Sequence, residues 1–536
     1  MINYTSDQPY ASVRQPIYAN RGMVATSQPL AAQAGLDMLK KGGNAIDAAI
    51  AAAACLTVVE PTSNGIGGDA FALIWVKGKL HGLNASGYSP KAISIEKLKE
   101  QGYSEIPETG WAPVTVPGVP SAWAAMSERF GKLPLTEVLQ PAIDYARNGY
   151  PVSRTLARVW NLEFHRFKRL LKGEPFEHWF QTFAPKGRAP RIGEVWASPD
   201  HAATLQKIAE THAESFYRGE LAEKIAQFSE ETNGYLTFED LAEYEPEWVD
   251  PICVNYRGYD VWEIPPNGQG LIALQALNIA EGFDFQHKDS ADTYHKQIEA
   301  LKLAFTDGQE YIADPRFMKM PVEALLSKDY AAERRRLIGD EAITPKPGRP
   351  PKGGTVYLAA ADREGNMVSF IQSNYIEFGS GLVVPGTGIA LQNRGCSFSF
   401  DPHSDNALAP RKKPYHTIIP GFLTKENEAV GPFGVMGAFM QPQGHMQVMM
   451  NAIDFGLNPQ AALDAPRWNW VAGKTIELEH TVPNHIAVAL ADRGHDVRIM
   501  VEPYSFGRGQ IIWRDPKTGV LVGGTEHRTD GTVAAW

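Results

Sequence analysis

The tripeptide Gly353-Gly354-Thr355 constrains this chain of 536 residues more than any other part of its sequence. It follows a segment rich in proline and basic residues, 344–352, and opens the strand-like run Val356 to Ala361. If the Gly354-Thr355 bond were cut, Thr355 would carry both a hydroxyl nucleophile and a free α-amine that can serve as its general base. The position therefore suggests a self-cleaving chain whose second part begins with its own nucleophile.

The same tripeptide occurs again at Gly523-Gly524-Thr525. Taken by itself, a Gly-Gly-Thr next to a strand is more often the end of a loop than a cleavage site. After Thr525 only a short tail remains, whereas Thr355 is followed by strands, glycine turns and polar residues. We therefore take Thr355 as the candidate nucleophile and Thr525 as its control.

The length exceeds what one hydrophobic core usually supports, so two lobes or one large layered domain are expected. A formal net charge of -10, with no basic stripe in the sequence, argues against nucleic acid as a partner. The most apolar stretch, Ala45 to Val59, contains Asp47 and is too short to span a bilayer, so no membrane partner is expected. The N-terminal residues do not resemble a secretory signal, and a cytoplasmic location is expected.

The sequence offers little support for metal or cofactor chemistry. Cys55, Cys253 and Cys396 are far apart and odd in number, which fits neither a disulfide framework nor a zinc pair. His416 and His445 are isolated, and an isolated histidine is more often a structural or substrate-facing group than a metal ligand. We therefore expect no metal and no cofactor.

Local signals predict the order helix, helix, glycine loop, strand near the N-terminus. Pro29 and Gly42-Gly43 bracket the first helix, an alanine-rich helix follows over 44–59, and an apolar strand is expected over 70–76. The loop 60–69 between them lacks the spacing of a dinucleotide-binding fingerprint, so we interpret it as a tight connection.

Residues 355–361 and 367–373 are predicted to form two strands joined by a turn at 362–366. Such a hairpin places Thr355 and Ser373 at the same end, where the Ser373 hydroxyl could orient the nucleophile. A polar residue at a sheet edge is the alternative interpretation of Ser373.

Several motifs in a fixed order resemble the γ-glutamyltransferase family of N-terminal-nucleophile hydrolases, and the resemblance covers nearly the whole chain. They are Gly42 to Ala49, Glu60 to Gly68, Val116 to Pro120, Gly353-Gly354-Thr355 and the Asn451 to Pro466 region. The resemblance implies an α+β fold, a four-layer αββα sandwich. It also implies a precursor that cleaves itself at Gly354-Thr355 into a large subunit, 1–354, with a cleavable linker at about 344–354, and a small subunit, 355–536. These two subunits are the expected protein partners, and a dimer of such heterodimers is an open alternative.

The resemblance also implies catalytic roles. Thr355 would be the nucleophile and, through its α-amine, the base, with Ser373 orienting it. Residues 434–438 align with the glycine-rich loop of the family, so the backbone N–H groups of Gly437 and Ala438 would form the oxyanion hole. A strand-to-helix turn is the other interpretation of this loop, and both can hold.

The residues that would recognise a glutamyl group depart from the family pattern. Ser86 stands where typical members carry an arginine for the α-carboxylate, and Ser397 stands where they carry an aspartate for the α-amino group. Tyr375 replaces an asparagine, and His416-Thr417 replace paired serines.

Arg394 is the expected replacement anchor, because a guanidinium matches a carboxylate bidentately. A structural ion pair is an equally weighted alternative for Arg394. Tyr375, His416 and Thr417 would complete the substrate pocket. The Asn393-Arg394-Gly395 segment resembles the divergent cytoplasmic branch of the family, which includes oxamate amidohydrolases and members described as glutathione hydrolases.

We therefore expect a self-processing amidohydrolase that hydrolyses the amide bond of a small carboxylate-bearing substrate, with an oxamate-like amide favoured. Three alternatives remain open. The first is a glutathione hydrolase or γ-glutamyl transpeptidase, with acyltransferase activity. The second is a cephalosporin-type acylase, and the third is an unprocessed, non-catalytic protein that kept the fold.

Overall fold

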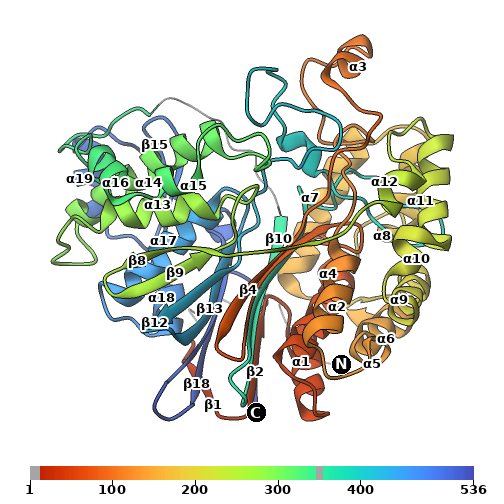
Figure 1. Cartoon of the computed structure of the whole chain (residues 1–536), viewed down its shortest axis with the longest axis horizontal. Helices are drawn as coiled ribbons and strands as arrows, with labels where there is room; N and C mark the ends of the chain where they lie inside the picture. Colours follow the sequence, from red (N-terminus) through yellow and green to blue (C-terminus); the bar gives the residue numbers. More distant parts are fainter. Residues whose placement is uncertain (1–12, 346–353) are drawn as a thin grey trace.

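The computed structural model describes residues 13–345 and 354–536. Within them, two seven-stranded sheets pack face to face, and a layer of helices covers the outer face of each sheet (Figure 1). The expected α+β four-layer αββα sandwich is confirmed. Most of the linker predicted at 344–354, namely 346–353, lies outside the described residues.

Both sheets combine strands from before and after residue 354. In spatial order, the first sheet contains β19 (Thr532–Ala535), β2 (Gly22–Thr26), β10 (Gly354–Asp362), β11 (Met367–Tyr375), β3 (Asp69–Val76), β4 (Lys79–Ala85) and β7 (Glu247–Val249). The second contains β1 (Ile17–Ala19), β18 (Leu521–Thr525), β17 (Arg508–Arg514), β13 (Glu428–Met436), β12 (Gly421–Lys425), β9 (Tyr259–Glu263) and β8 (Ile252–Tyr256). The segments before and after residue 354 are therefore interleaved within one sandwich.

The helices form two groups, one over each sheet. On the side of the first sheet lie α1 (Pro29–Lys40), α2 (Ala45–Val59), α4 (Val119–Phe130), α5 (Leu135–Val138), α6 (Gln140–Asn148), α7 (Arg154–Leu170), α8 (Glu177–Phe183), α9 (Pro199–Thr211), α10 (Glu214–Arg218), α11 (Glu220–Glu231) and α12 (Phe238–Ala242). On the side of the second lie α13 (Gly270–Ala280), α14 (Ala291–Tyr311), α15 (Val322–Leu325), α16 (Lys328–Arg335), α17 (Met440–Ile453), α18 (Pro459–Asp464) and α19 (Asn484–Asp492).

Smaller elements complete the described chain. They are α3 (Ile95–Glu100), the 3-10 turns η1 (Glu174–Phe176), η2 (Arg394–Ser397) and η3 (Pro503–Phe506), the pair β5 (Tyr150–Pro151) and β6 (Val195–Trp196), and the three-stranded sheet of β14 (Trp468–Ala472), β15 (Thr475–Glu479) and β16 (Asp496–Met500).

Helix α2 is buried along its whole length, as its composition predicts. Asn44 caps it, and a capping box joins Asn44 to Asp47. Its alanine side chains are small, so the helix packs closely on β10 and β11. The Gln372 amide on β11 donates to the Ala53 carbonyl oxygen at 2.8 Å, which fixes the hairpin strand against this helix.

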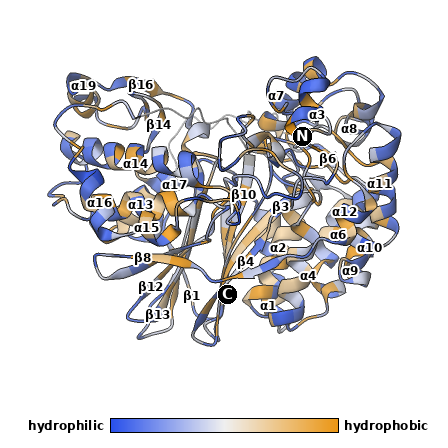
Figure 2. Ribbon diagram, turned by 45° about the horizontal axis from the view of Figure 1, so that its top comes forward, coloured by the Kyte–Doolittle hydropathy of each residue, from blue (hydrophilic) through white to orange (hydrophobic). Residues whose placement is uncertain are grey.

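The space between the sheets is filled by apolar side chains, and the ribbon coloured by hydropathy shows apolar strands here (Figure 2). Tyr357 on β10 reaches across toward β13, where Gly434 leaves room for its ring. The Tyr357 hydroxyl also lies 2.8 Å from the Ser369 hydroxyl. β10 is therefore packed on both faces, by α2 on one side and through Tyr357 against the second sheet on the other.

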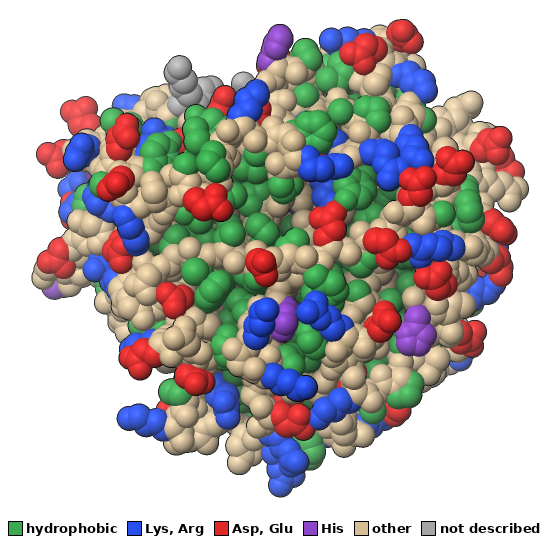
Figure 3. Space-filling view, viewed as in Figure 1, with side chains coloured by type: hydrophobic (Ala, Val, Ile, Leu, Met, Phe, Trp, Pro, Cys, Tyr) green, Lys and Arg blue, Asp and Glu red, His purple; other side chains and the backbone are tan. Residues whose placement is uncertain are grey.

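Acidic and basic side chains are interspersed over the face of the molecule seen in Figure 3. No helix among the described residues is long and apolar enough to cross a membrane. Cys55, Cys253 and Cys396 are free thiols.

Candidate active site

Thr355 lies at the start of β10, opposite the end of β11. The two strands pair in antiparallel register, with an irregularity between Gly354 and Val356. The Thr355 Oγ1 donates to Ser373 Oγ at 3.2 Å, and the Tyr375 N–H donates to the same oxygen at 2.8 Å. Thr355 is only 1% exposed. The prediction that a hairpin brings Ser373 beside Thr355 is confirmed.

Tyr375 ends β11 in an unusual conformation. Its φ of 77° lies in the left-handed region, which costs a residue other than glycine on the order of 1 kcal/mol. This turn places its ring under the Arg394 guanidinium, whose central carbon is 4.0 Å from the ring centroid. The Tyr375 hydroxyl has no hydrogen-bond partner among the described residues. The strand that carries Ser373 therefore also supplies the surface on which Arg394 stacks.

Arg394, in η2, is 1% exposed. Its Nη1 donates to the Thr417 hydroxyl at 2.7 Å, whereas its Nε and Nη2 have no hydrogen-bond partner among the described residues. Burial lowers its pKa to about 10, so the guanidinium remains charged at neutral pH. No carboxylate among the described residues forms an ion pair with Arg394. The described residues therefore give no support to the alternative that Arg394 belongs to a structural ion pair.

His416 forms a buried pair with Asp69, which begins β3. The His416 Nε2 lies 3.0 Å from Asp69 Oδ2, and the Ile418 N–H donates to His416 Nδ1 at 3.3 Å. This arrangement assigns the ring proton to Nε2, which donates to Asp69. Burial, with Arg394 and Lys413 nearby, holds the pKa of His416 well below its ordinary value, so the ring is neutral.

Gly437 and Ala438 form the turn between β13 and α17. Both have positive φ, 136° and 50°. The Gln269 amide donates to the Thr417 and Ala438 carbonyl oxygens at 2.6 and 2.8 Å, and so ties this turn to the Arg394 side of the site. The strand-to-helix turn is confirmed, while the oxyanion-hole role of the two N–H groups stays a prediction.

Ser397 and Ser86, which stand where the family pattern has an aspartate and an arginine, have structural hydrogen-bond partners. The Ser397 hydroxyl is bonded to the Arg394 and Tyr415 carbonyl oxygens at 2.7 and 2.6 Å. Ser86 Oγ donates to Asn84 Oδ1 at 2.7 Å. His445 pairs with the buried Glu263 at 2.6 Å, which agrees with a structural rather than a ligating histidine.

One group of described residues has the spacing of a metal site: His295, Glu299 and His495, whose ligand atoms lie within 4.8 Å of one another. The Lys302 ammonium already lies 2.6 Å from Glu299 Oε1 and balances its charge. His295 and His495 bond directly to each other at 2.9 Å. These contacts account for the cluster as a buried polar network.

The residue that sequence reasoning missed is Asp69. It lies at the end of the glycine loop that we interpreted only as a tight connection. In the strand register it pairs with Ser373, the neighbour of Thr355. The available signal was an acidic side chain between a glycine pair and the apolar run Ala70 to Val76. A carboxylate at the start of a buried strand is costly unless it has a partner, so such a position indicates a specific role.

A sequence model of the family described as Gamma-glutamyltranspeptidase matches residues 31–536. The Glutathione hydrolase-like YwrD proenzyme of Bacillus subtilis (strain 168) is 38% identical over 97% of this chain and 99% of its own length. The Oxamate amidohydrolase proenzyme of Klebsiella pneumoniae subsp. pneumoniae is 34% identical, again over 97% of this chain and 99% of its own. A solved structure described as cephalosporin acylase from Bacillus halodurans is 64% identical with a TM-score of 0.98, and it covers 100% of this chain and 99% of its own.

Proposed function

The chain belongs to the gamma-glutamyltranspeptidase family and is a hydrolase of amide bonds, and from this premise we propose that it processes itself at Gly354-Thr355 and then removes a carboxylate-bearing acyl group from an amide. The proenzyme names of the relatives support processing into two subunits of one precursor, 1–354 and 355–536. The interleaved sheets keep the two products together after the cut.

In the proposed reaction, Thr355 Oγ attacks the amide carbonyl carbon while its proton passes to the Thr355 α-amine. The oxygen of the carbonyl becomes negative and is bound by the N–H groups of Gly437 and Ala438. The C–N bond then breaks, the α-amine returns the proton to the leaving nitrogen, and an ester on Thr355 remains. Water attacks this ester with the α-amine again as base, which releases the acid and restores the threonine hydroxyl.

Ser373 supports this role of Thr355 through geometry. Its oxygen accepts a hydrogen bond from the Thr355 hydroxyl and a second one from the Tyr375 N–H, which fixes the position of that oxygen. A hydroxyl held this way spends less of its time in unproductive rotamers, so the attacking lone pairs are oriented before the substrate arrives.

One observation carries the substrate proposal: Arg394 presents two unsatisfied nitrogens in a buried site. A buried donor without an acceptor costs roughly 1–3 kcal/mol, more when it is charged, and a carboxylate would remove this penalty. Because Tyr375 and Thr417 already fix the guanidinium plane, little side-chain entropy remains to be lost on binding. Tyr375, Thr417 and His416 then form the walls of the acyl pocket.

Two acyl classes compete for this role. An oxamate-like amide places the carboxylate directly on the scissile carbonyl, and the Klebsiella relative supports it. A cephalosporin-type acylase activity is the second candidate, and the 64% identity to the Bacillus halodurans structure favours it. Glutathione hydrolysis finds less support, because Ser86 and Ser397 hold structural hydrogen bonds where an arginine and an aspartate would grip the glutamyl head group.

The test compares matched substrates on the purified, processed enzyme. One pair is glutaryl p-nitroanilide and its counterpart in which the free carboxylate is a carboxamide, and the other pair is oxamate and oxamide. We call the members of each pair the charged and the neutral substrate. A γ-glutamyl anilide is measured alongside them. A higher kcat/KM for the charged than for the neutral member of either pair would support the proposal. The pair whose charged member has the higher kcat/KM would decide between the oxamate-like and the cephalosporin-type acyl group.

Arg394→Met removes the guanidinium and keeps most of the side-chain length. We expect kcat/KM for the charged substrate to fall roughly 10- to 100-fold, because a hydrogen bond to a charged group contributes about 1.5–3 kcal/mol, while the neutral substrate changes less. Arg508→Met is the matched control. Arg508 is also buried and stacked on a tyrosine, Tyr504, but it faces Glu60. An equal loss for both substrates in Arg394→Met would exclude Arg394 as the anchor.

A further inference from the structure

Asp69 lies in the candidate site without a role in the reaction above. Its side chain is fully buried, and Ser373 is its partner in the β3–β11 register. Oδ2 accepts from His416, and Oδ1 accepts from the Gly87 N–H at 3.2 Å. No lysine or arginine of the described residues forms an ion pair with it. The carboxyl group is therefore held by neutral donors alone.

Arg394 is the cation with the largest electrostatic effect on Asp69. Burial raises the pKa of Asp69 to about 7, and the charge of Arg394 is the first influence that opposes this rise. In the same way burial lowers the pKa of Arg394, and Asp69 is among the charges that oppose it. Geometry links the two side chains through adjacent residues, because Arg394 donates to the Thr417 hydroxyl and His416 donates to Asp69. They form no direct ion pair, and Nε and Nη2 of Arg394 have no hydrogen-bond partner among the described residues.

We propose that Asp69 is a specificity-determining residue: its carboxylate opposes a second anion in this buried site, so binding of the acyl carboxylate at Arg394 is accompanied by uptake of one proton by Asp69. This inference rests on the proposed function of Arg394. It adds that the preference for a charged acyl group depends on pH. With Asp69 neutral, Arg394 is free to pair with the substrate, and with Asp69 ionised, part of its charge is already balanced.

The other ionisable groups near Asp69 do not titrate in its place. His416 is neutral, and its Nδ1 is occupied by the Ile418 N–H. Lys413 forms an ion pair with Glu247 at 3.0 Å. Tyr217 and Tyr244 are buried close enough to Asp69 to interact with its charge. Burial raises the pKa of both hydroxyls above the ordinary value, so both stay neutral.

The sign of the effect follows from the raised pKa. Asp69 is mostly protonated below about pH 7 and ionised above it. A bound anion favours the protonated form further, so affinity for the charged substrate falls as the pH rises through 7, by up to about tenfold per pH unit. The neutral substrate brings no charge and should not follow this slope.

The experiment is the pH dependence of the ratio of kcat/KM for the charged and the neutral substrate, from about pH 5.5 to 8.5. Titration of the Thr355 α-amine affects both substrates alike and cancels in this ratio. We expect the ratio of the parent enzyme to fall as the pH rises through 7. In Asp69→Asn it should be higher at pH 8 than in the parent and nearly independent of pH.

Glu60→Gln is the matched control. Glu60 is also a buried carboxyl group whose pKa burial raises to about 7, but it faces Ser27 and Arg508 rather than Arg394. Its variant should keep the slope of the parent. Processing of each variant into two fragments serves as the test of folding. If a variant does not process, the parent enzyme gives an independent readout. At about pH 8, where Asp69 is mostly ionised, binding of glutarate should take up about one proton, measured by calorimetry in two buffers of different ionisation enthalpy.

The possible outcomes separate this inference from the proposal on which it rests. A strong preference for the charged substrate that does not change with pH would leave Arg394 as the anchor and overturn the role of Asp69. A slope that persists in Asp69→Asn would do the same. No preference at any pH, or no turnover of either charged substrate, would overturn the proposed function itself.

Discussion

The two Gly-Gly-Thr sequences of this chain end in very different surroundings. Thr355 opens β10, and its hydroxyl bonds to Ser373 on the neighbouring strand. Thr525 closes β18, and its hydroxyl has no hydrogen-bond partner among the described residues. The same Gly-Thr pair therefore lies at the start of one strand, at Gly354-Thr355, and at the end of another, at Gly524-Thr525. What distinguishes a candidate nucleophile is the hydroxyl beside it and the chain that follows it.

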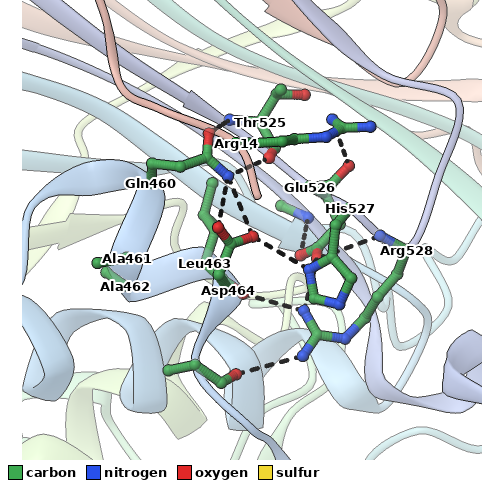
Figure 4. A network of polar contacts seen from close by, with 12 residues as sticks. Arg14, Gln460, Ala461, Ala462, Leu463, Asp464, Thr525, Glu526, His527 and Arg528 are labelled. Atoms are coloured by element: carbon green, nitrogen blue, oxygen red, sulfur yellow. Dashed lines mark hydrogen bonds and ion pairs between the residues drawn. The ribbon is translucent and has the colours of Figure 1, made fainter. Parts of the chain in front are cut away.

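The glycines before Thr525 serve packing. A Cβ on Gly524 would lie 2.7 Å from the carbonyl carbon of Pro459, and one on Gly523 would overlap the Met23 sulfur. Gln460 then binds both the N–H and the carbonyl oxygen of Thr525, at 3.0 and 2.9 Å. Figure 4 shows Thr525 beside this glutamine, next to a network of charged side chains that includes Glu526 and Arg528. The backbone of Thr525 is thus engaged while its side chain is not.

The largest expected effect separates the two threonines directly. Thr355→Ala should abolish cleavage into two fragments and lower amide hydrolysis by on the order of 10³-fold or more, because it removes the nucleophile of both events. Thr525→Val, which keeps the shape and removes an unbonded hydroxyl, should leave both unchanged. Intact mass and N-terminal sequencing check this, and a fragment of Thr355→Ala that still begins at residue 355 would contradict it.

Replacement of Ser373 tests the contact that distinguishes Thr355 from Thr525. Ser373→Ala removes the oxygen that accepts both the Thr355 hydroxyl and the Tyr375 N–H. We expect processing and turnover to slow by roughly tenfold, the equivalent of one hydrogen bond. Single-turnover rates and the time course of cleavage measure this. Ser373→Thr, which keeps the hydroxyl, should restore most of the rate, and a fully active alanine variant would remove Ser373 from the site.

A smaller effect is expected from the packing glycine. Gly524→Ala forces a methyl group against the Pro459 and Gln460 backbone, which should lower the free energy of unfolding by roughly 1–3 kcal/mol without changing the cleavage point. Gly456→Ala is a useful comparison, since that glycine has open space around it but a φ of 66°. Denaturant unfolding of both variants separates overlap from backbone strain. An unchanged midpoint in Gly524→Ala would show that this strand shifts at little cost.

Much of this arrangement could be predicted from sequence because it depends on local signals. Pro29, Asn44 and the glycine pair at 42–43 delimit two helices, and the turn at 362–366 defines the hairpin that pairs Thr355 with Ser373. Such contacts follow from periodicity and turn chemistry within a few residues.

The role of Asp69 could not be predicted in this way. Asp69 contacts His416 and feels the charge of Arg394 only because two distant segments converge on the start of β3. The local sequence does not reveal that the Arg394 guanidinium lacks a carboxylate partner, because the presence of a partner depends on every element packed around Arg394. Long-range charge relations of this kind require the tertiary structure.

The interleaving of strands from both sides of residue 354 determines whether the protein could refold after cleavage. While the chain is whole, its folding is a unimolecular reaction, and the linker holds the two parts at high local concentration. Once the bond is cut, a molecule that unfolds must find its other half by diffusion, in competition with aggregation. The mature enzyme would therefore owe its persistence to slow unfolding rather than to an equilibrium that it can re-establish.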